Sequence, residues 1–441
     1  MLNIMWEVLR LCRLRNSDII WAEGREKRMT DGREIRIEWE RQPEGFPDFL
    51  KENPDLFPKV EAEQKRENRA LVQEFSQRMQ KRLRQKPDGM RQQELWEQEL
   101  EQDFMDFSER ERILSLSEWM SPELLAGFKR ETKHFLNRVR AFDETLTPAQ
   151  IWQSMRNYLI YAMIVEMQGE EQNARDPILA YSLLYPYTDN YIDDGQISRQ
   201  EKERYNRMIA MKLQGETVVP QSLLEEKTCR LLHMVLEAYE GVGKRRIAGT
   251  LLQLLEAQHC SIGQQQTAVT EEQILEISIR KGSTSVLADY LFAAADWTEY
   301  EESFYLKFGF LLQLVDDLQD IEEDRRTGSH TLMTEAKDRR SLERKVNRLL
   351  WFTWNVIREF EPRNPGLKGF VLKNCVEISL MTAAMSPQFF SRRYLKALEP
   401  YLPFSLEFIK KLKKKPENLD GNSSVQDLAQ SAHLHFLSDL L

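Results

Sequence analysis

Apolar residues along the chain recur mainly at the three- and four-residue spacing of an α-helix, and the alternation typical of a half-buried β-strand is scarce. Helices are predicted over 59–86, 104–116, 123–141, 148–168, 200–213, 222–240, 245–260, 271–280, 284–295, 300–323, 340–361, 368–384 and 391–413. The pattern therefore predicts an all-α protein, with one large helical bundle as its main body.

Local signals mark two helix starts and a change in character along the chain. Ser121 and Thr147 each precede a proline and are predicted N-caps. Charge density falls near residue 115, and the apolar period becomes steadier after it. We therefore expect a charged helical extension over 1–115, an all-α domain over 116–413 and a polar tail over 414–441.

Composition narrows the classes of function. The net charge of −9 argues against non-specific nucleic-acid binding. The four cysteines lie far apart, which disfavours a disulfide scaffold or a structural zinc site and indicates a cytoplasmic protein. No stretch has the apolar length of a membrane span. The apolar segment 1–15 contains one glutamate and three arginines, so it is predicted to pack on the protein itself or to lie at a membrane surface.

The stretch LLQLVDDLQDIEEDRR at 311–326 carries an apolar helix directly into a group of carboxylates. Asp316, Asp320 and Asp324 are four residues apart, so they form one slanted stripe on a helix, and Asp317 can flank it. A solvated acidic helix end is the ordinary explanation of such a charge run. The preceding FYLKFGFLLQLV is apolar on nearly all sides, however, which predicts a buried helix whose acids line the mouth of a cavity.

A second acidic cluster lies in LLYPYTDNYIDDGQISRQE at 183–201. Asp189 and Asp193 are one helical turn apart, with Asn190 between them. Taken alone, this cluster is also explained as a helix-ending turn before a new N-cap at Ser198. Two carboxylate stripes on separate apolar helices, facing each other, could hold Mg²⁺ ions that bridge a diphosphate.

These motifs resemble those of the class I isoprenoid synthases, which are the trans-prenyltransferases and the ionising terpene synthases. GFLLQLVDDLQDIEED is similar to their second aspartate-rich motif and YTDNYIDD to their first, in the D-N-x-x-D form of bacterial large-terpene synthases. IRKGSTSVLADYLFAAA at 279–295 resembles the helix that carries a diphosphate-binding lysine, which places Lys281 at that position. AQHCSIGQQQ at 257–266 resembles the preceding glutamine-bearing helix, with Gln264 or Gln265 as the match.

The resemblance implies a Mg²⁺ cofactor, an isoprenyl diphosphate substrate and a set of site residues. The implied metal-binding residues are Asp189, Asn190, Asp193, Asp316, Asp317, Asp320 and Asp324. The implied catalytic residues are Asp189, Asp193, Asp316, Asp320 and Lys281. The implied substrate-binding residues are Arg280, Lys281, Arg325, Gln264 and Gln313, with Arg326 left at the surface. Aromatic residues that line the cavity, or alternatively only fill the core, are Tyr185, Tyr187, Tyr290, Trp297, Phe304 and Phe308.

Two departures from the family pattern bear on the reaction. Nothing before residue 183 matches the GGKxxRP-like segment that holds a second diphosphate in chain-elongating enzymes, and GQISRQEKERY follows the first motif where an Arg-Arg-Gly-x-Pro would be expected. We therefore expect a terpene synthase that cyclises or rearranges one substrate. The alternatives are a prenyltransferase or head-to-head condensing synthase, and a catalytically silent helical partner subunit. A homodimer is an alternative to a monomer.

Overall fold

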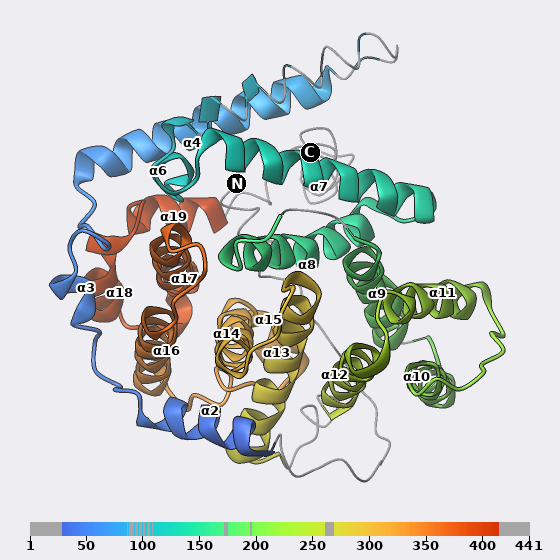
Figure 1. The fold of residues 1–441 in the computed structure, drawn as a ribbon. Coiled ribbons are helices and arrows are strands. Elements are labelled where there is room, and N and C mark those ends of the chain that lie inside the picture. Colours follow the sequence, from blue (N-terminus) through green and yellow to red (C-terminus); the bar gives the residue numbers. More distant parts are fainter. Residues whose placement is uncertain are drawn as a thin grey trace. The chain divides into compact units, whose positions relative to one another are not determined.

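The computed structural model describes residues 29–85, 109–171, 175–194, 196–260 and 269–413, together with single positions between 86 and 108. For Asp189 and Asp193 it describes the backbone alone. Within this part of the chain every regular element is a helix and no strand is present, so the predicted all-α class is confirmed (Figure 1). The N-terminal segment before residue 29 and the tail after residue 413 lie outside the described residues.

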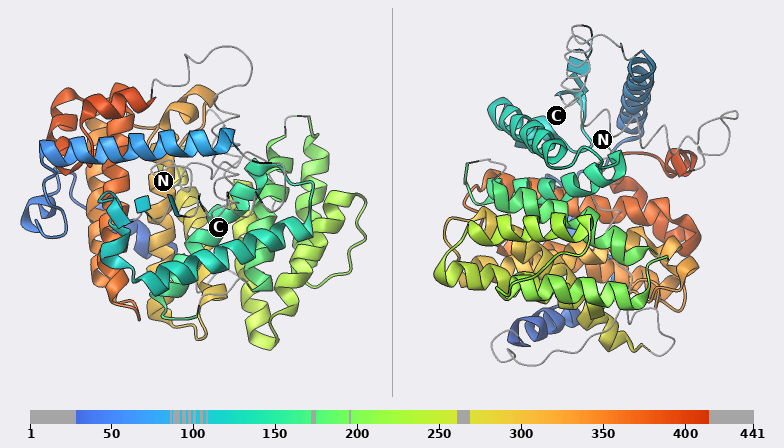
Figure 2. Two further views of the ribbon diagram at one scale, coloured as in Figure 1. Left: turned by 90° about the horizontal axis from the view of Figure 1, so that it is seen from above. Right: turned by 90° about the vertical axis from the view of Figure 1, so that its right-hand side faces the viewer.

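The chain divides into two compact units, each made of two segments that are distant in the sequence. Unit 1 combines the described residues up to Phe46 with Gln153–Lys368. Its helices are α2 (Met29–Arg41), most of α8 (Pro148–Met167), α9 (Asp176–Asp193), α10 (Arg199–Leu213), α11 (Leu223–Glu237), α12 (Gly241–Cys260), α13 (Glu271–Ala293), α14 (Glu299–Gln319), α15 (Ile321–Thr327) and α16 (Arg339–Glu359). Figure 2 shows α10, α11 and α12 as neighbours within this unit.

Unit 2 combines Pro47–Trp152 with the described residues from Gly369 onwards. Its helices are α3 (Phe49–Glu52), α4 (Ala62–Arg84), α6 (Leu116–Trp119), α7 (Pro122–Phe142), most of α17 (Gly366–Met385), η2 (Pro387–Phe389), α18 (Arg392–Leu398), η3 (Glu399–Tyr401) and α19 (Leu406–Lys413). The boundary expected near residue 115 falls inside this unit, and the expected division into extension, domain and tail stays a prediction.

Helix α2 explains why the first described segment belongs with unit 1. Its side chains Ile35 and Trp39 are buried. The Trp39 ring lies edge-on to Phe310 of α14 and to Phe352 of α16, at centroid distances of 5.7 and 5.9 Å. Apolar burial of this kind ties a helix to its neighbours irrespective of its place in the sequence. Helix α2 is therefore part of the unit-1 core.

Helix starts follow the local signals closely. The Ser121 hydroxyl accepts from the Leu124 amide at 3.2 Å, and the Thr147 hydroxyl accepts from the Gln150 amide at 3.3 Å. Ser198 forms a full capping box with Glu201. Each hydroxyl satisfies an amide at the open end of a helix, so these predicted N-caps are confirmed.

Helix α13 runs unbroken from Glu271 to Ala293, although two helices separated near Gly282 were expected. Gly282 does not end the helix, because it lies where α13 crosses α14. A Cβ added at Gly282 would lie 2.4 Å from the carbonyl oxygen of Gly309, and one added at Gly309 would lie 2.2 Å from that of Gly282. The two glycines let the two backbones approach closely, and α13 and α14 form the most extensive helix pair of unit 1 (Figure 1).

Three other predicted helices end or divide differently. The helix expected over 300–323 ends at Gln319, and α15 begins after Asp320, which has φ −89° and ψ 5°. The segment 391–413 is divided by Pro400 and Pro403 into α18, η3 and α19. The helix expected over 104–116 does not continue through 111–115, where the Glu111 carboxylate accepts from the amides of Ile113 and Leu114 at 2.8 and 2.7 Å.

Candidate functional site

The end of α14 buries a cluster of acidic side chains inside unit 1. The apolar residues before it, among them Phe310, Leu311 and Leu314, are completely buried, so the predicted burial of this helix is confirmed. Asp316 and Asp317 are each 5% exposed. Carboxylates are rarely buried to this degree unless they are paired or hold a metal ion. The cluster is therefore not a solvated helix end.

Asp320 and Asp324 continue the acidic stripe where α14 passes into α15. Asp320 is 8% exposed and Asp324 is partly exposed. The helical hydrogen bonds continue across the junction, since the Asp320 amide donates to the Asp316 carbonyl at 2.9 Å and the Asp324 amide donates to the Asp320 carbonyl at 2.8 Å. Glu322, by contrast, is exposed, as expected. The backbone therefore places Asp316, Asp320 and Asp324 one helical turn apart, as the sequence predicted.

Two carboxylate oxygens in this cluster are left without a hydrogen bond. Gln313 of α14 donates its Nε2–H to Asp317 Oδ1 at 2.8 Å. Asp317 Oδ2 and Asp316 Oδ1 are buried and have no hydrogen-bond partner among the described residues. A buried polar atom without a partner loses its hydration at a cost of about 1–3 kcal/mol. Such atoms commonly mark a place that a ligand or ion completes.

The charges near Asp316 and Asp317 do not compensate for the burial of these two carboxyls. Burial raises the pKa of Asp316 to about 7, against the opposing influence of Lys281 and Arg156, while Asp317 and Asp324 raise it further. Burial also raises the pKa of Asp317 to about 7, although the Gln313 hydrogen bond and Lys281 act to lower it. Lys281 thus acts on both acids and Arg156 on Asp316, without fully stabilising their charged form.

Lys281 reaches this cluster because of the close contact between α13 and α14. It precedes Gly282, and a Cβ at Gly282 would lie 2.7 Å from the Gln313 Cβ. The residue that orients Asp317 therefore packs against the turn of α13 that carries Lys281. The lysine expected from the resemblance and the acids of the second motif are brought together in one region of unit 1.

The first acidic motif lies at the end of α9. The side chains of Asp189 and Asp193 lie outside the described part, so their predicted ligand roles stay predictions. Asn190 is exposed, and its Nδ2–H donates to the Pro186 carbonyl at 2.7 Å. One turn before Asp189, the Tyr185 hydroxyl lies 2.8 Å from Ser285 Oγ of α13. Ser285 is one turn after Lys281, so Asp189 and Lys281 each lie one helical turn from this contact between α9 and α13.

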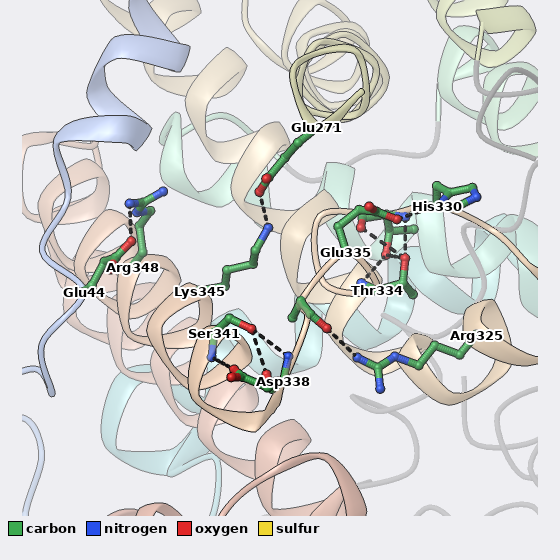
Figure 3. A network of polar contacts seen from close by, with 12 residues as sticks. Glu44, Glu271, Arg325, His330, Thr334, Glu335, Asp338, Ser341, Lys345 and Arg348 are labelled. Carbon is green, nitrogen blue, oxygen red and sulfur yellow. Dashed lines mark hydrogen bonds and ion pairs between the residues drawn. The ribbon is translucent and has the colours of Figure 1, made fainter. Parts of the chain in front are cut away.

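Two predicted cationic residues make contacts away from the buried acids. Arg280 is exposed and its Nε–H donates to Glu276 at 2.7 Å. Arg325 is also exposed, and its Nη2–H donates to the Ala336 carbonyl at 3.2 Å (Figure 3). Arg280 thus contacts a residue of its own helix, and Arg325 contacts the loop before α16. Their predicted role in binding a diphosphate stays a prediction.

Figure 3 shows how the segment between α15 and α16 is fixed. His330 Nδ1 lies 2.6 Å from the Glu335 carboxylate, and the Thr334 hydroxyl donates to the Ser329 carbonyl at 3.0 Å. Asp338 caps α16, whose Lys345 forms an ion pair with Glu271 at the start of α13. These contacts order the segment between α15 and α16, and the Lys345–Glu271 pair joins α16 to α13.

The predicted aromatic residues take different places in unit 1. Tyr290 is completely buried, donates to Glu301 at 2.9 Å and accepts from the Thr298 amide at 3.1 Å. Phe304 stacks on Phe360 at 3.6 Å between ring centroids, and Phe308 is 5% exposed. These rings are buried, which agrees with both explanations, so their predicted place in the lining of a cavity stays a prediction. Gln264 and Gln265 lie outside the described residues.

Two polar residues of α8 and one of α13 were not identified from the sequence. Arg156 is 5% exposed and lowers the pKa of Asp316, and the neighbouring Asn157 donates to Asp289 of α13 at 3.1 Å. The available signal was a polar residue in an otherwise apolar helix, as in SMRNYLIYAMIV and TSVLADYLFAAA. A buried polar residue usually has a specific partner, but the pattern does not show which one.

Comparisons with known proteins do not assign a family. No protein-family model matches the chain, and no curated protein is significantly similar to it. Within the described residues, no set of three or more His, Cys, Asp and Glu side chains has the arrangement of a metal site. In the same part of the chain, no helix combines the length and apolar character that crossing a membrane requires.

Proposed function

We propose that the protein is a Mg²⁺-dependent enzyme that ionises a linear isoprenyl diphosphate and cyclises or rearranges the resulting carbocation. The observation that carries this proposal is the pair of buried aspartates, Asp316 and Asp317, with Lys281 acting on both and Arg156 on Asp316. Acids and bases gathered in one buried region suit a ligand that contains both a divalent cation and a phosphate anion.

The chemistry of the acidic residues supports a hard divalent cation, although the described side chains do not stand together in the arrangement of a metal site. Asp316 Oδ1 and Asp317 Oδ2 are buried oxygens with no other hydrogen-bond partner in the described part of the chain. Mg²⁺ prefers oxygen ligands and is usually shared between a few carboxylates, waters and substrate phosphates. Asp316, Asp317 and Asp320 would hold it, with Asp324 at the edge. When bound, Mg²⁺ neutralises charge that develops on the departing diphosphate.

The chain's own side chains supply the other requirements of such a reaction. Lys281 and Arg156 would attract the diphosphate and stabilise it as it leaves. Gln313 holds Asp317 in one orientation through its 2.8 Å hydrogen bond. The buried apolar part of α14 would exclude water from the hydrocarbon chain, which a carbocation requires. Lys281, Arg156 and the acids all belong to unit 1.

Cation binding can be tested without a substrate. Titration calorimetry of the purified protein with Mg²⁺ should show binding that Asp316→Ala abolishes. Glu322→Ala is the matched control, since Glu322 is an exposed acid six residues further along the same segment. Equal binding by the wild type and both variants would contradict the proposed metal site.

Activity is tested with Mg²⁺ and farnesyl or geranylgeranyl diphosphate, measuring released diphosphate and analysing the products by mass spectrometry. We expect a hydrocarbon or alcohol from a single substrate, and a loss of about 100-fold or more in Asp316→Ala, since charge stabilisation at a leaving group contributes this much. A product that requires added isopentenyl diphosphate would indicate a condensing enzyme. No ionisation of any linear diphosphate would indicate a silent helical subunit.

A further inference from the structure

The side-chain amide of Gln319, the last residue of α14, is buried and forms no hydrogen bond. Neither its Nε2 nor its Oε1 has a partner in the described part of the chain. A buried amide ordinarily uses both its donor and its acceptor, because each loses its hydration on burial. Among the described side chains with buried unpaired atoms, Gln319 alone has two. Its surroundings are therefore incomplete at both ends of the amide.

Gln319 lies beside the buried acids on α14. It follows Asp316 by three residues, and residues at this spacing are neighbours on the surface of a helix. At about 100° per residue, Gln319 lies about 60° to one side of Asp316, and Asp317 lies about 100° to the other side. Asp316 Oδ1 is also buried without a partner among the described residues. One turn of helix thus contains two unpaired acceptors, Asp316 Oδ1 and Gln319 Oε1, and one unpaired donor, Gln319 Nε2–H.

A second glutamine on the same helix shows the arrangement that Gln319 lacks. Gln313 donates its Nε2–H to Asp317 Oδ1 at 2.8 Å, one turn further along. Gln319 is also within one turn of an aspartate, Asp316, yet the two side chains form no such bond. Asp316 and Gln319 therefore leave polar atoms for a group that the described residues do not supply.

The exposure and charge of this region favour an anionic ligand over an enclosed water molecule. Gln319 and Lys281 are both partly exposed, which places them at the edge of the packed core, where a ligand from solvent has access. The charge of Lys281 acts on Asp316 and Asp317, and it attracts an anion to the same region. An unpaired N–H in this region suits a phosphate oxygen, because hydrogen bonds to charged acceptors are the stronger ones.

We propose that Gln319 donates a hydrogen bond from its Nε2–H to an oxygen of the substrate's diphosphate group. This inference rests on the proposed function and adds a residue to its substrate site. Gln319 is uncharged, so it contributes a directed hydrogen bond rather than general attraction for the anion. Its contribution belongs to diphosphate binding, whereas binding of Mg²⁺ alone depends on the aspartates. The two kinds of binding are therefore separable by substitution at Gln319.

Without a ligand, the buried amide of Gln319 lowers the stability of the protein, because its two ends lose their hydration and gain no partner. Leucine is apolar and of similar size, so Gln319→Leu removes both unpaired atoms. We expect the ligand-free variant to unfold at the same urea concentration as the wild type or at a higher one. A glutamine with a purely structural role would give the opposite result.

Titration calorimetry with inorganic diphosphate, in a fixed excess of Mg²⁺, tests the hydrogen bond directly. We expect Gln319→Leu to bind diphosphate about 10- to 100-fold more weakly than the wild type, the usual contribution of a hydrogen bond to a charged group. Its affinity for Mg²⁺ alone should stay unchanged. Gln319→Glu keeps the length of the side chain and an oxygen, but a carboxylate has no N–H donor, so this variant should also bind diphosphate weakly.

Gln168→Leu is the matched control. Gln168 is 2% exposed and also has a buried unpaired Oε1, but its Nε2–H donates to the Tyr305 hydroxyl at 2.9 Å. Tyr305 lies about three turns before Asp316 on α14. Gln168→Leu should therefore lower stability and leave the affinity for diphosphate unchanged, which is the reverse of Gln319→Leu.

Equal affinity of the wild type, Gln319→Leu and Gln319→Glu for diphosphate would overturn this role, and Gln319 would then contact only an enclosed water molecule. The proposed function is not contradicted in that case, because the wild type binds Mg²⁺ and diphosphate. A wild-type protein that binds neither would overturn the proposed function together with this inference. Far-ultraviolet circular dichroism shows whether each variant folds. If Gln319→Leu does not fold, the comparison of the wild type with Gln319→Glu decides the question.

Discussion

Asp316 and Asp317 combine burial with incomplete pairing, and this combination should make stability depend on pH. Their pKa values of about 7 in the folded protein lie above the value near 3.9 of an unfolded aspartate. The folded state therefore binds more protons than the unfolded state between these two values. Stability from this source is fully present below about pH 4 and is lost as pH rises through about 7.

The metal-free protein should accordingly unfold more easily as pH rises from 5 to 7, with a change on the order of 1.4 kcal/mol per pH unit for each carboxyl that takes up a proton on folding. Urea unfolding at several pH values measures this. Asp316→Asn should flatten the dependence, because asparagine does not titrate, and Mg²⁺ should flatten it too by replacing the protons. A pH dependence identical in the wild type and Asp316→Asn would show that Asp316 is ionised in the folded protein.

At the scale of elements, the pairing of α13 with α14 decides where the acids and Lys281 meet. This pairing depends on Gly282 and Gly309, because each would place a Cβ against the backbone of the other helix. The apolar pattern predicted two helices, one ending before Gly282 and one beginning after it. A glycine inside a helix has two explanations, a break or a close contact, and only the partner helix distinguishes them.

Gly282→Ala should destabilise the protein by about 1–3 kcal/mol, because the added methyl group overlaps the Gly309 carbonyl and forces the helices apart. Gly249→Ala is the matched control. Gly249 also lies inside a helix, α12, but a Cβ there meets nothing within 4 Å, so alanine should stabilise by about 0.5–1 kcal/mol. Urea unfolding of the three proteins measures the difference, and equal loss in both variants would show that helix contact is not the cause.

At the scale of the whole molecule, two segments distant in sequence form the unit that contains the candidate site. Helix α2 packs through Trp39 on α14 and α16, and the Glu44 carboxylate pairs with Arg348 of α16 at 2.6 Å (Figure 3). The first described helix of the region before residue 115 therefore packs in the core around α14.

Trp39→Ala should destabilise the protein by about 3–5 kcal/mol, since a large buried ring is removed from between two helices. Ile37→Ala, on the same helix but 36% exposed, should change stability far less. Thermal unfolding followed by circular dichroism compares the two. A small effect of Trp39→Ala would show that α2 is dispensable for this unit.

Sequence alone determined the properties that depend on neighbouring residues. The period of apolar positions determined the all-α class, hydroxyl residues beside prolines determined helix starts such as Ser121, and the apolar run before Asp316 determined that its helix is buried. Tertiary structure decided the rest: that α13 continues through Gly282, that α2 joins residues after 153, and that Arg156 and Lys281 act on Asp316. These depend on contacts between residues far apart in the chain, which no local period records, because a local pattern shows that a side chain is buried but not what it is buried against.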